Sequence, residues 1–359
     1  MKEVTLREVA KEAGVSLATV SFALRNSPKI SLEKREHIQA VAQRMGYRQS
    51  PLVSASMARM RGSRDTNYQA TLGWVNDNPD VEYWHGHKTF QGAKARAEEL
   101  GYVLDELFLD KIRHEEPEAN VRRFCQIAQA RGIHGVILPE QYRIHHVQEE
   151  WPEMAVVVIG HVAGELHRST LKRQGFYCPF HNVVPDTFSN LRLAYDALRE
   201  RGYRRIGLVS SEWFNWHSDN LMRAAALEFN QLVPPGERVP PFFDETSGKR
   251  SPDSFARWVE KSRPDVVVGT FFEVGGWLKQ LGLKVPDDIG LAHINLGSLE
   301  QGWSGIDQRN ELIGAAAVDL LTAHLLRNER GIPSYPKRVA VPGCWVDGKT
   351  ARGVVAARL

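Results

Sequence analysis

The chain of 359 residues is long enough for two or three domains, and its 42% hydrophobic and 25% charged residues are ordinary for a globular protein. It contains no run of 18 apolar residues and no signal-peptide core at its charged start, so the sequence predicts no membrane partner. Cys125, Cys178 and Cys344 lie too far apart for a disulfide framework or a metal-ligand spacing, which favours a cytoplasmic protein.

The net charge of +3 is unevenly distributed. Residues 1–64 contain 12 Lys and Arg against 5 Asp and Glu, a formal charge of +7, whereas the rest of the chain carries −4. A basic head on a mildly acidic body is typical of a head that meets phosphate. The alternative is a solvated basic surface with no partner.

The first expected helix has one apolar face, formed by Leu6, Val9, Ala10 and Ala13. Thr5 precedes it and Glu8 follows three residues later, the pattern of a capping box in which two side chains satisfy backbone N–H groups. Gly14 comes after the last apolar residue, where a left-handed backbone ends a helix at little cost.

A second helix is expected to begin at Ser16, with Val20, Ala23 and Leu24 facing inward. The tight turn between the two helices indicates helix-turn-helix geometry, in which the second helix lies in the DNA major groove. Leu17, Ala18 and Phe22 then face outward, and apolar side chains can contact the thymine methyl there. The alternative is that Phe22 packs against its own chain.

Ser31 is expected to start a third helix, whose inward residues are Ile38, Val41, Ala42 and Met45. The three helices predict an all-α head over residues 1–49. Ser50 and Pro51 then suit the start of a short hinge helix within residues 50–67. Such a length is only marginally helical in water, and the alternative is a plain linker.

From residue 70 onward, short apolar runs alternate with amphipathic stretches. The expected strands are 72–75, 103–109, 135–138, 156–159, 206–209, 266–268 and 289–294. The expected helices are 90–100, 121–130, 191–201, 221–229, 277–281 and 313–326. This alternation predicts an α/β core over residues 68–359, built from two Rossmann-like lobes with parallel sheets. Ligands of such sheets bind beyond the carboxyl ends of the strands.

No enzyme motif is present: the sequence has no GxGxxG after a strand, no P-loop, no G-x-S-x-G and no HExxH. His85 with His87, and His145 with His146, lack further ligands at a standard spacing. The sequence therefore predicts no cofactor and no metal site. An enzyme on the two-lobed core and a solute-binding protein without a DNA role remain as alternatives.

The head segment "VTLREVAKEAGVSLATVSFALRNSPKISLEKREHIQAVAQRMGYRQSP" closely resembles the headpiece of the LacI–GalR family of bacterial transcription repressors. The matching residues include 4–6, 9–10, 13–16, 18–21 and 46–48. In the body, "RRIGLV", "GLKVPDDIGLAHI" and "IDQRNELIGAAAVDLL" look like the periplasmic-binding-protein-like core of that family. The resemblance covers nearly the whole chain and is weakest at residues 210–265.

The resemblance implies a homodimer that binds double-stranded DNA at a near-palindromic operator, and a core that binds a small effector. It places Leu17, Ala18 and Phe22 at base edges. It places Thr5, Ser16, Thr19, Ser21, Lys29 and Ser31 at phosphates. The family usually has Arg where this chain has Phe22, and Phe cannot pair with guanine through two hydrogen bonds, so the preferred base is expected to shift.

The family's hinge helix normally inserts a Leu side chain into the minor groove at a central base step. Ser56 stands at that position here and is too small and polar to act as the wedge, so Leu52 or Met57 would have to replace it.

For the effector, Arg223 matches an Arg that holds polar effectors in many family members, and Asn295 matches an acidic contact. Phe271 and Phe272 replace a usual Asn-Asp pair. Because aromatic rings can stack on sugar faces, we expect a sugar or sugar-like effector, with Trp84, and also Trp213 and Trp216, near it. The alternatives are that these rings belong to the core or to the dimer interface, and that the core binds nothing.

By the same resemblance, lobe 1 is expected to comprise residues 68–163 and 296–326, and lobe 2 residues 164–295 and 327–347. The function predicted from the whole sequence is that of a DNA-binding transcriptional regulator, a repressor, with a ligand-sensing core.

Overall fold

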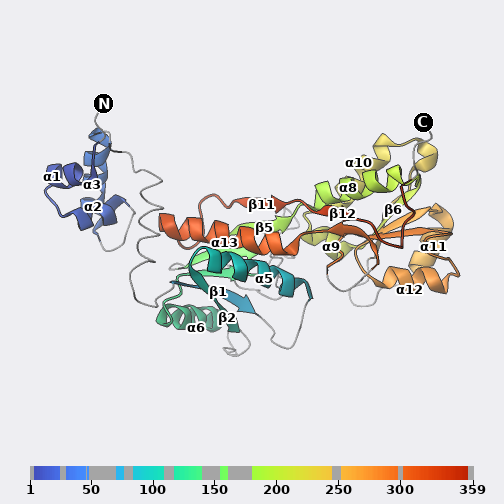
Figure 1. Ribbon diagram of the computed structural model, residues 1–359, viewed down its shortest axis with the longest axis horizontal. Helices are drawn as coiled ribbons and strands as arrows, with labels where there is room; N and C mark the ends of the chain where they lie inside the picture. Colours follow the sequence, from blue (N-terminus) through green and yellow to red (C-terminus); the bar gives the residue numbers. More distant parts are fainter. Residues whose placement is uncertain are drawn as a thin grey trace.

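The computed structural model describes residues 4–24, 30–45, 47, 70–76, 84–108, 117–139, 154–160, 180–244, 252–297 and 302–354 (Figure 1). The side chains of residues 84–87 and 117–122 lie outside this description, as does the predicted hinge. Within the described part, no helix is both long and apolar enough to cross a membrane.

The head consists of three helices, α1 (Leu6–Glu12), α2 (Leu17–Leu24) and α3 (Leu32–Arg44). Each helix contributes to one small apolar cluster, whose fully buried members are Val9, Ala10, Val20, Ala23, Ile38, Val41 and Ala42. The Gln39 side chain also donates a hydrogen bond of 2.9 Å to the carbonyl of Ala23, so α3 holds the carboxyl end of α2. The predicted inward faces of all three helices are thereby confirmed.

The first lobe is built on a parallel sheet with the strand order β11-β5-β4-β3-β1-β2. Its strands are β1 (Ala70–Asn76), β2 (Tyr102–Phe108), β3 (Gly135–Leu138), β4 (Ala155–Ile159), β5 (His181–Pro185) and β11 (Arg338–Val341). Helices α5 (Trp84–Glu99) and α13 (Asn310–Arg327) pack on one face, and α6 (Pro117–Ala130) packs on the other. Both faces are covered, which explains why the central strands are apolar throughout.

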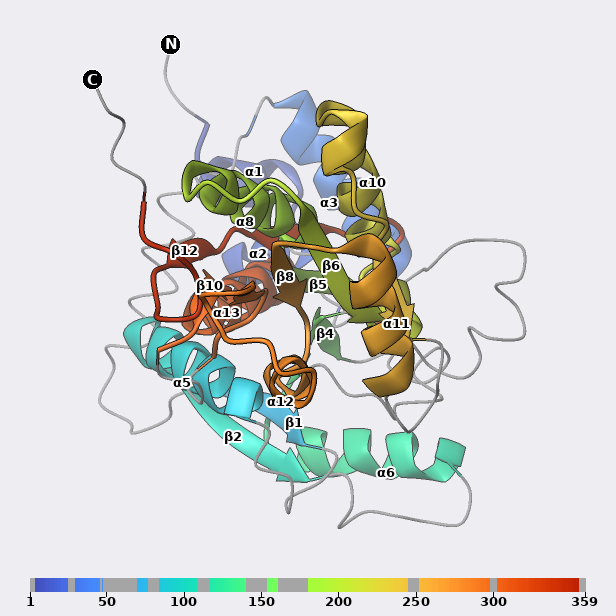
Figure 2. The same cartoon turned by 90° about the vertical axis from the view of Figure 1, so that its right-hand side faces the viewer.

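Helices α5 and α13 lie side by side, as Figures 1 and 2 both show. A Cβ at Gly314 would lie 1.9 Å from the carbonyl oxygen of Thr89, and one at Gly92 would lie 2.0 Å from that of Glu311. Only glycine therefore permits this backbone approach.

The second lobe is built on a sheet with the strand order β12-β10-β9-β8-β6-β7, in which only the edge strand β12 runs antiparallel to its neighbour. Its strands are β6 (Ile206–Ser211), β7 (Phe242–Asp244), β8 (Val266–Gly269), β9 (Gly290–His293), β10 (Ser304–Asp307) and β12 (Cys344–Val346). Its helices are α8 (Thr187–Glu200), α9 (Glu212–His217), α10 (Leu221–Leu232), α11 (Pro252–Ser262) and α12 (Glu273–Gln280). Figure 2 shows α8 and α10 on one side of this sheet and α11 and α12 on the other.

The chain passes between the two lobes three times: after β5, after β10 and after β11. The predicted lobe boundaries differ from the sheets, because residues 181–185 and 338–341 are strands of the first sheet and 304–307 is a strand of the second. Each crossing lies at a strand end, where neither composition nor periodicity changes in a way that the sequence reveals.

Candidate DNA-binding head and effector site

The start of α1 and the turn between α1 and α2 both have the predicted capping chemistry. The Glu8 carboxylate accepts hydrogen bonds from the Thr5 backbone N–H at 2.7 Å and from the Thr5 hydroxyl at 2.9 Å. Gly14 has φ +62°, the left-handed conformation that ends α1. The Ser16 hydroxyl then accepts from the Thr19 backbone N–H at 3.2 Å, so Ser16 caps α2 as predicted.

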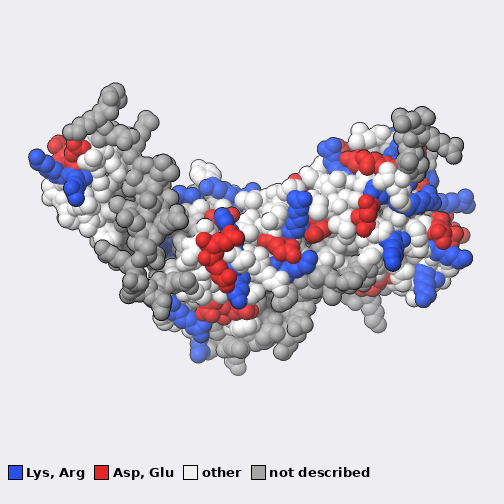
Figure 3. Space-filling model, in the orientation of Figure 1, with Lys and Arg blue, Asp and Glu red and all other residues white. Residues whose placement is uncertain are grey.

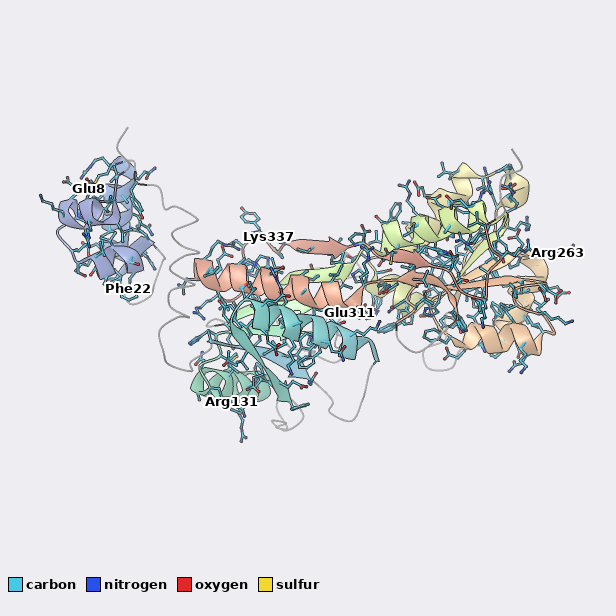
Figure 4. The ribbon with its side chains drawn as sticks, viewed as in Figure 1. Glu8, Phe22, Arg131, Arg263, Glu311 and Lys337 are labelled. Carbon is cyan, nitrogen blue, oxygen red and sulfur yellow. The ribbon has the colours of Figure 1, made fainter. Side chains whose placement is uncertain are left out.

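The outward row of α2 lies outside the head's apolar cluster. Leu17 is 43% exposed, Ala18 is exposed and Phe22 is half-buried. Figure 4 shows Phe22 at the edge of the head, on the opposite side from Glu8. An exposed leucine on a short, well-packed helix leaves apolar surface available to another molecule, while Val20 and Ala23 hold the helix from behind.

The polar residues expected at phosphates gather at helix amino ends. Thr5, Ser16 and Ser31 are the N-cap positions or first residues before α1, α2 and α3, and Thr19 lies in the first turn of α2. Helix amino ends attract phosphate through their free N–H groups. Ser21 lies further along α2 and is half-buried, and Lys29 lies outside the described residues.

Three of these hydroxyl groups already have partners within the head. The Thr5 hydroxyl donates to Glu8, and the hydroxyls of Ser16 and Thr19 lie 2.8 Å apart. Leu52, Ser56 and Met57 of the predicted hinge lie outside the described residues.

Arg223 lies in the first turn of α10 and is held from two sides. Its guanidinium forms an ion pair with Glu212 at the start of α9 and lies over the Phe243 ring, 4.2 Å from the ring centre. Its backbone N–H donates to the buried Asn215 side chain at 3.1 Å. Both charged side chains remain about two-fifths exposed, so this ion pair is accessible to a polar ligand.

Phe272 and Asn295 lie together at the carboxyl ends of β8 and β9. The Phe272 ring stacks on the His293 ring with centroids 4.0 Å apart, and the Asn295 backbone N–H donates to His293 Nδ1 at 3.0 Å. The Asn295 side-chain oxygen is buried and accepts no hydrogen bond from any described residue. Such an acceptor is costly unless a donor reaches it, which makes it a candidate ligand contact.

Phe271 faces the other way. It is 3% exposed and packs in the cluster between the sheet and α11–α12, with its ring 5.4 Å from that of Trp277. The structure therefore places the Phe271 ring in the core, and its contact with a ligand stays a prediction.

Two of the remaining aromatic candidates, Trp213 and Trp216, lie on α9. Trp213 stacks on His217 with centroids 3.7 Å apart in α9, and the Trp84 side chain lies outside the described residues. Arg223 contacts Phe243 of β7, while Phe272 and Asn295 follow β8 and β9. In the sheet, β6 lies between β7 and β8. Sequence reasoning missed Glu212 and His293, although both follow or end an apolar strand, which is where ligand contacts of parallel sheets occur.

A second cluster of titratable groups lies in the first lobe. His181 and His324 stack with centroids 3.8 Å apart and an interplanar angle of 12°, and His324 Nδ1 contacts Glu329. Burial lowers the pKa of His181 to about 4, with His324 adding to the effect, and burial also lowers the pKa of His324. A hydrogen bond from Arg327 lowers the pKa of Glu329 to about 2.

The spacing of these three side chains is compatible with a metal ion, but the ring orientation is not. A metal ion lies in the plane of each imidazole that binds it, and two nearly parallel stacked rings cannot direct their lone pairs to one point. His181 Nδ1 also accepts a hydrogen bond of 2.9 Å from the Lys337 backbone N–H. We therefore treat the cluster as a buried neutral histidine pair.

The face of the core drawn in Figure 3 carries Lys and Arg interspersed with Asp and Glu over both lobes. Part of this pattern comes from ion pairs, including Arg96 with Asp319 and Lys88 with Glu311. No field of one sign covers the described residues on that face, so it does not resemble a surface for DNA.

Comparisons with known proteins agree with this division. Residues 5–50 match the family described as "Bacterial regulatory proteins, lacI family", and residues 195–351 match the "Periplasmic binding protein-like domain". The HTH-type transcriptional regulator GalR of Streptococcus thermophilus is 24% identical over 93% of this chain and 96% of its own length. The regulator GalS of Salmonella typhimurium is 27% identical over 58% of this chain, and the chain spans about half, 54%, of that relative.

Among solved structures, the lac repressor dimer bound to operator and the anti-inducer ONPF aligns with a TM-score of 0.53. The alignment covers 98% of this chain and 100% of that chain at 17% identity, which shows that the two share a fold. The helical head, the two α/β lobes and the family match lead to one assignment. The chain belongs to the lacI family of bacterial regulatory proteins.

Proposed function

We propose that this chain is a transcriptional repressor that binds a near-palindromic operator as a homodimer, with α2 of each head in the major groove. The observation that carries the proposal is the outward row of Leu17, Ala18 and Phe22, which stays accessible on a helix whose other face is fully packed. Apolar side chains at this place favour thymine methyl groups over guanine edges. Since bacterial DNA lies in the cytoplasm, that is where such a protein acts.

The dimer and the operator are proposed by likeness to the lac repressor dimer, which was solved on its operator. In the hinge, Ser56 stands where family members wedge a leucine, and we propose that Leu52 or Met57 supplies the apolar contact to the minor groove.

We further propose that the core senses a small polyhydroxyl molecule, such as a sugar, at the carboxyl ends of β6, β8 and β9. The Glu212–Arg223 pair offers both an acceptor and donors, Asn295 offers a buried acceptor, and Phe272 offers a ring. Because Arg223 is already neutralised by Glu212, this set suits an uncharged ligand better than an acid. Phe271 takes no part in it.

A core without an effector is the second candidate. The observations that favour it are the burial of Phe271 and the existing partners of Arg223, which leave fewer groups for a ligand than the family pattern suggests.

DNA binding is tested by selecting bound sequences from a random duplex library and titrating salt on the selected site. We expect an inverted repeat, and log K that falls with log salt by about 0.9 per neutralised phosphate. Recovery of no enriched sequence together with a flat salt response would contradict the proposed function.

The effector is tested by thermal shift of the full chain against a panel of neutral sugars and matched sugar acids. We expect a neutral sugar to raise the Tm, and Arg223→Ala to abolish the shift while selected-site binding remains. The matched control is Arg204→Ala, an exposed arginine at the opposite end of β6, which leaves the shift intact. No shift with any sugar would favour the core without an effector.

A further inference from the structure

The two lobes are joined by an ion pair as well as by the three chain crossings. Arg338, the first residue of β11 in the first lobe, forms an ion pair through Nη1 with Asp219, which lies between α9 and α10 of the second lobe. The exposed fractions of the Arg338 and Asp219 side chains are 38% and 21%, so solvent partly screens the attraction between their charges.

On the second lobe, Asp219 lies in a hydrogen-bonded turn. Asp219 and Asn220 both have left-handed backbones, with φ 55° and 62°, which Asp and Asn adopt more readily than other non-glycine residues. Asn215, 1% exposed, holds this turn: its side-chain NH2 donates to the Asn220 side chain at 2.8 Å, and its carbonyl accepts from the Asn220 N–H at 2.8 Å. The position of Asp219 is therefore fixed by Asn215.

The same asparagine also holds the helix that carries the proposed ligand contact. The Asn215 side-chain oxygen accepts a hydrogen bond from the backbone N–H of Arg223, at 3.1 Å. The guanidinium of Arg223 pairs with Glu212, which lies on the same short helix as Asn215. Asn215 therefore connects the backbone of Arg223 with the turn that contains Asp219, and it shares α9 with Glu212.

On the first lobe, Arg338 is equally well anchored. Its strand pairs with β5, where Arg338 lies opposite Asn182, and the preceding Lys337 N–H donates to His181 Nδ1 at 2.9 Å. His181 in turn stacks on His324 of α13. Figure 4 marks Lys337, and with it the start of β11, beside α13.

We propose that Asp219 and Arg338 form an interlobe clasp that sets the separation of the lobes, and that Asn215 transmits the state of the Glu212–Arg223 pair to it. The transmitting role of Asn215 rests on the proposed ligand site, whereas the clasp itself is present in the ligand-free chain. A partly exposed ion pair shifts a two-state equilibrium by up to about fivefold, enough to bias lobe opening without locking it.

The test is a distance measurement by pulsed electron resonance on the full chain without ligand. Spin labels replace Glu98 on the first lobe and Asp253 on the second, both exposed, in a background without Cys125, Cys178 and Cys344, and labelled chains are diluted with unlabelled ones. Asp219→Asn and Arg338→Gln are each expected to shift the populations by about fivefold, and Arg338→Lys, which keeps the charge, by much less. Asp196→Asn, an exposed carboxylate on α8 of the same lobe, is the matched control and leaves the distribution unchanged.

Unchanged distributions in both Asp219→Asn and Arg338→Gln would overturn the clasp, whether or not the core binds a sugar. Transmission is tested by Arg223→Gln, which breaks the pair with Glu212 and is expected to shift the distribution in the same direction. If only the clasp variants shift it, the role of Asn215 as transmitter is wrong while the clasp stands. If no sugar raises the Tm but the clasp variants still shift the distribution, the proposed ligand is wrong and the clasp stands.

Discussion

The head and the core treat the apolar residues on their candidate functional surfaces in opposite ways. The head keeps Leu17 and Ala18 exposed because α2 packs against the rest of the head on one side only. Val20 and Ala23 are the buried residues on that side. The core draws Phe271 into its interior and stacks Phe272 on His293, because both faces of its sheet are covered by helices. A short surface helix thus displays what its sequence suggests, whereas at the end of a buried strand the tertiary environment decides which ring is displayed.

The largest expected effect concerns the close helix packing that the core has and the head lacks. In Gly314→Ala, the new Cβ would lie 1.9 Å from the Thr89 carbonyl oxygen, so α5 and α13 must separate. We expect a loss of about 3 kcal/mol in the free energy of unfolding, measured by urea denaturation followed by circular dichroism. Gly276→Ala in α12, where a Cβ meets nothing within 4 Å, is the control and is expected to gain up to about 1 kcal/mol. Similar losses in both variants would contradict this account of the packing.

Acid is expected to weaken the core through its histidine pair. The pKa of His181 is about 4 in the folded chain against an ordinary value of 6.5, so the unfolded chain binds more protons between these values. The stability that the neutral His181 contributes is therefore fully present above pH 6.5 and is lost as the pH falls towards 4. By pH 5, His181 alone lowers the free energy of unfolding by about 2 kcal/mol. His181→Asn keeps an acceptor for the Lys337 N–H but cannot titrate, and it should flatten the dependence of unfolding free energy on pH between 7 and 5. A slope unchanged in that variant would show that other groups dominate.

For the head, the comparison predicts that an outward side chain of α2 matters more for DNA binding than for folding. Phe22→Ala is expected to weaken the selected site about tenfold and random DNA much less, because base contacts specify and phosphate contacts do not. Fluorescence anisotropy on both duplexes measures the difference. Leu32→Ala, a 60% exposed leucine at the start of α3, is the control for losing apolar surface elsewhere on the head. Equal losses on both duplexes in Phe22→Ala would remove the base-reading role.

The smallest expected effect separates two serines that both precede a helix. Ser16 accepts a hydrogen bond from the Thr19 N–H, whereas Ser31 caps α3 without a side-chain hydrogen bond. Ser16→Ala should cost about 1 kcal/mol of head stability and Ser31→Ala much less. Amide hydrogen exchange in peptides covering α2 and α3 reports each loss, and the reverse order would show that the caps act differently.

Much of the fold could be predicted from the sequence because local chemistry determines it. The capping box of Thr5 and Glu8, the Ser16 cap and the left-handed Gly14 are all present, and the apolar run 135–138 is β3 itself. Short elements such as β7 and α9 were missed, since three strand residues or six helical residues show too little periodicity. The three crossings between lobes also left no local signal.

The candidate sites divide in the same way. Leu17 and Ala18 were predicted as exposed from helical spacing alone, and they are. The partners of Arg223 were not foreseen, because Glu212 and Phe243 reach it from other elements and only the folded chain brings them together. The stacked pair His181 and His324 lies 143 positions apart in sequence, so no spacing rule could have joined them.

The repeated crossing of the chain between the two lobes affects the order in which the protein folds during its synthesis on the ribosome. The described head ends at Tyr47, so its three helices can pack when about an eighth of the chain has emerged. The first sheet, in contrast, waits for its edge strand β11 at residues 338–341, and the second waits for β12 just after it. Since domains fold in order of synthesis, the proposed DNA-binding head is complete long before the core that contains the proposed effector site. A nascent chain therefore carries a folded head while both sheets of its core still lack a strand.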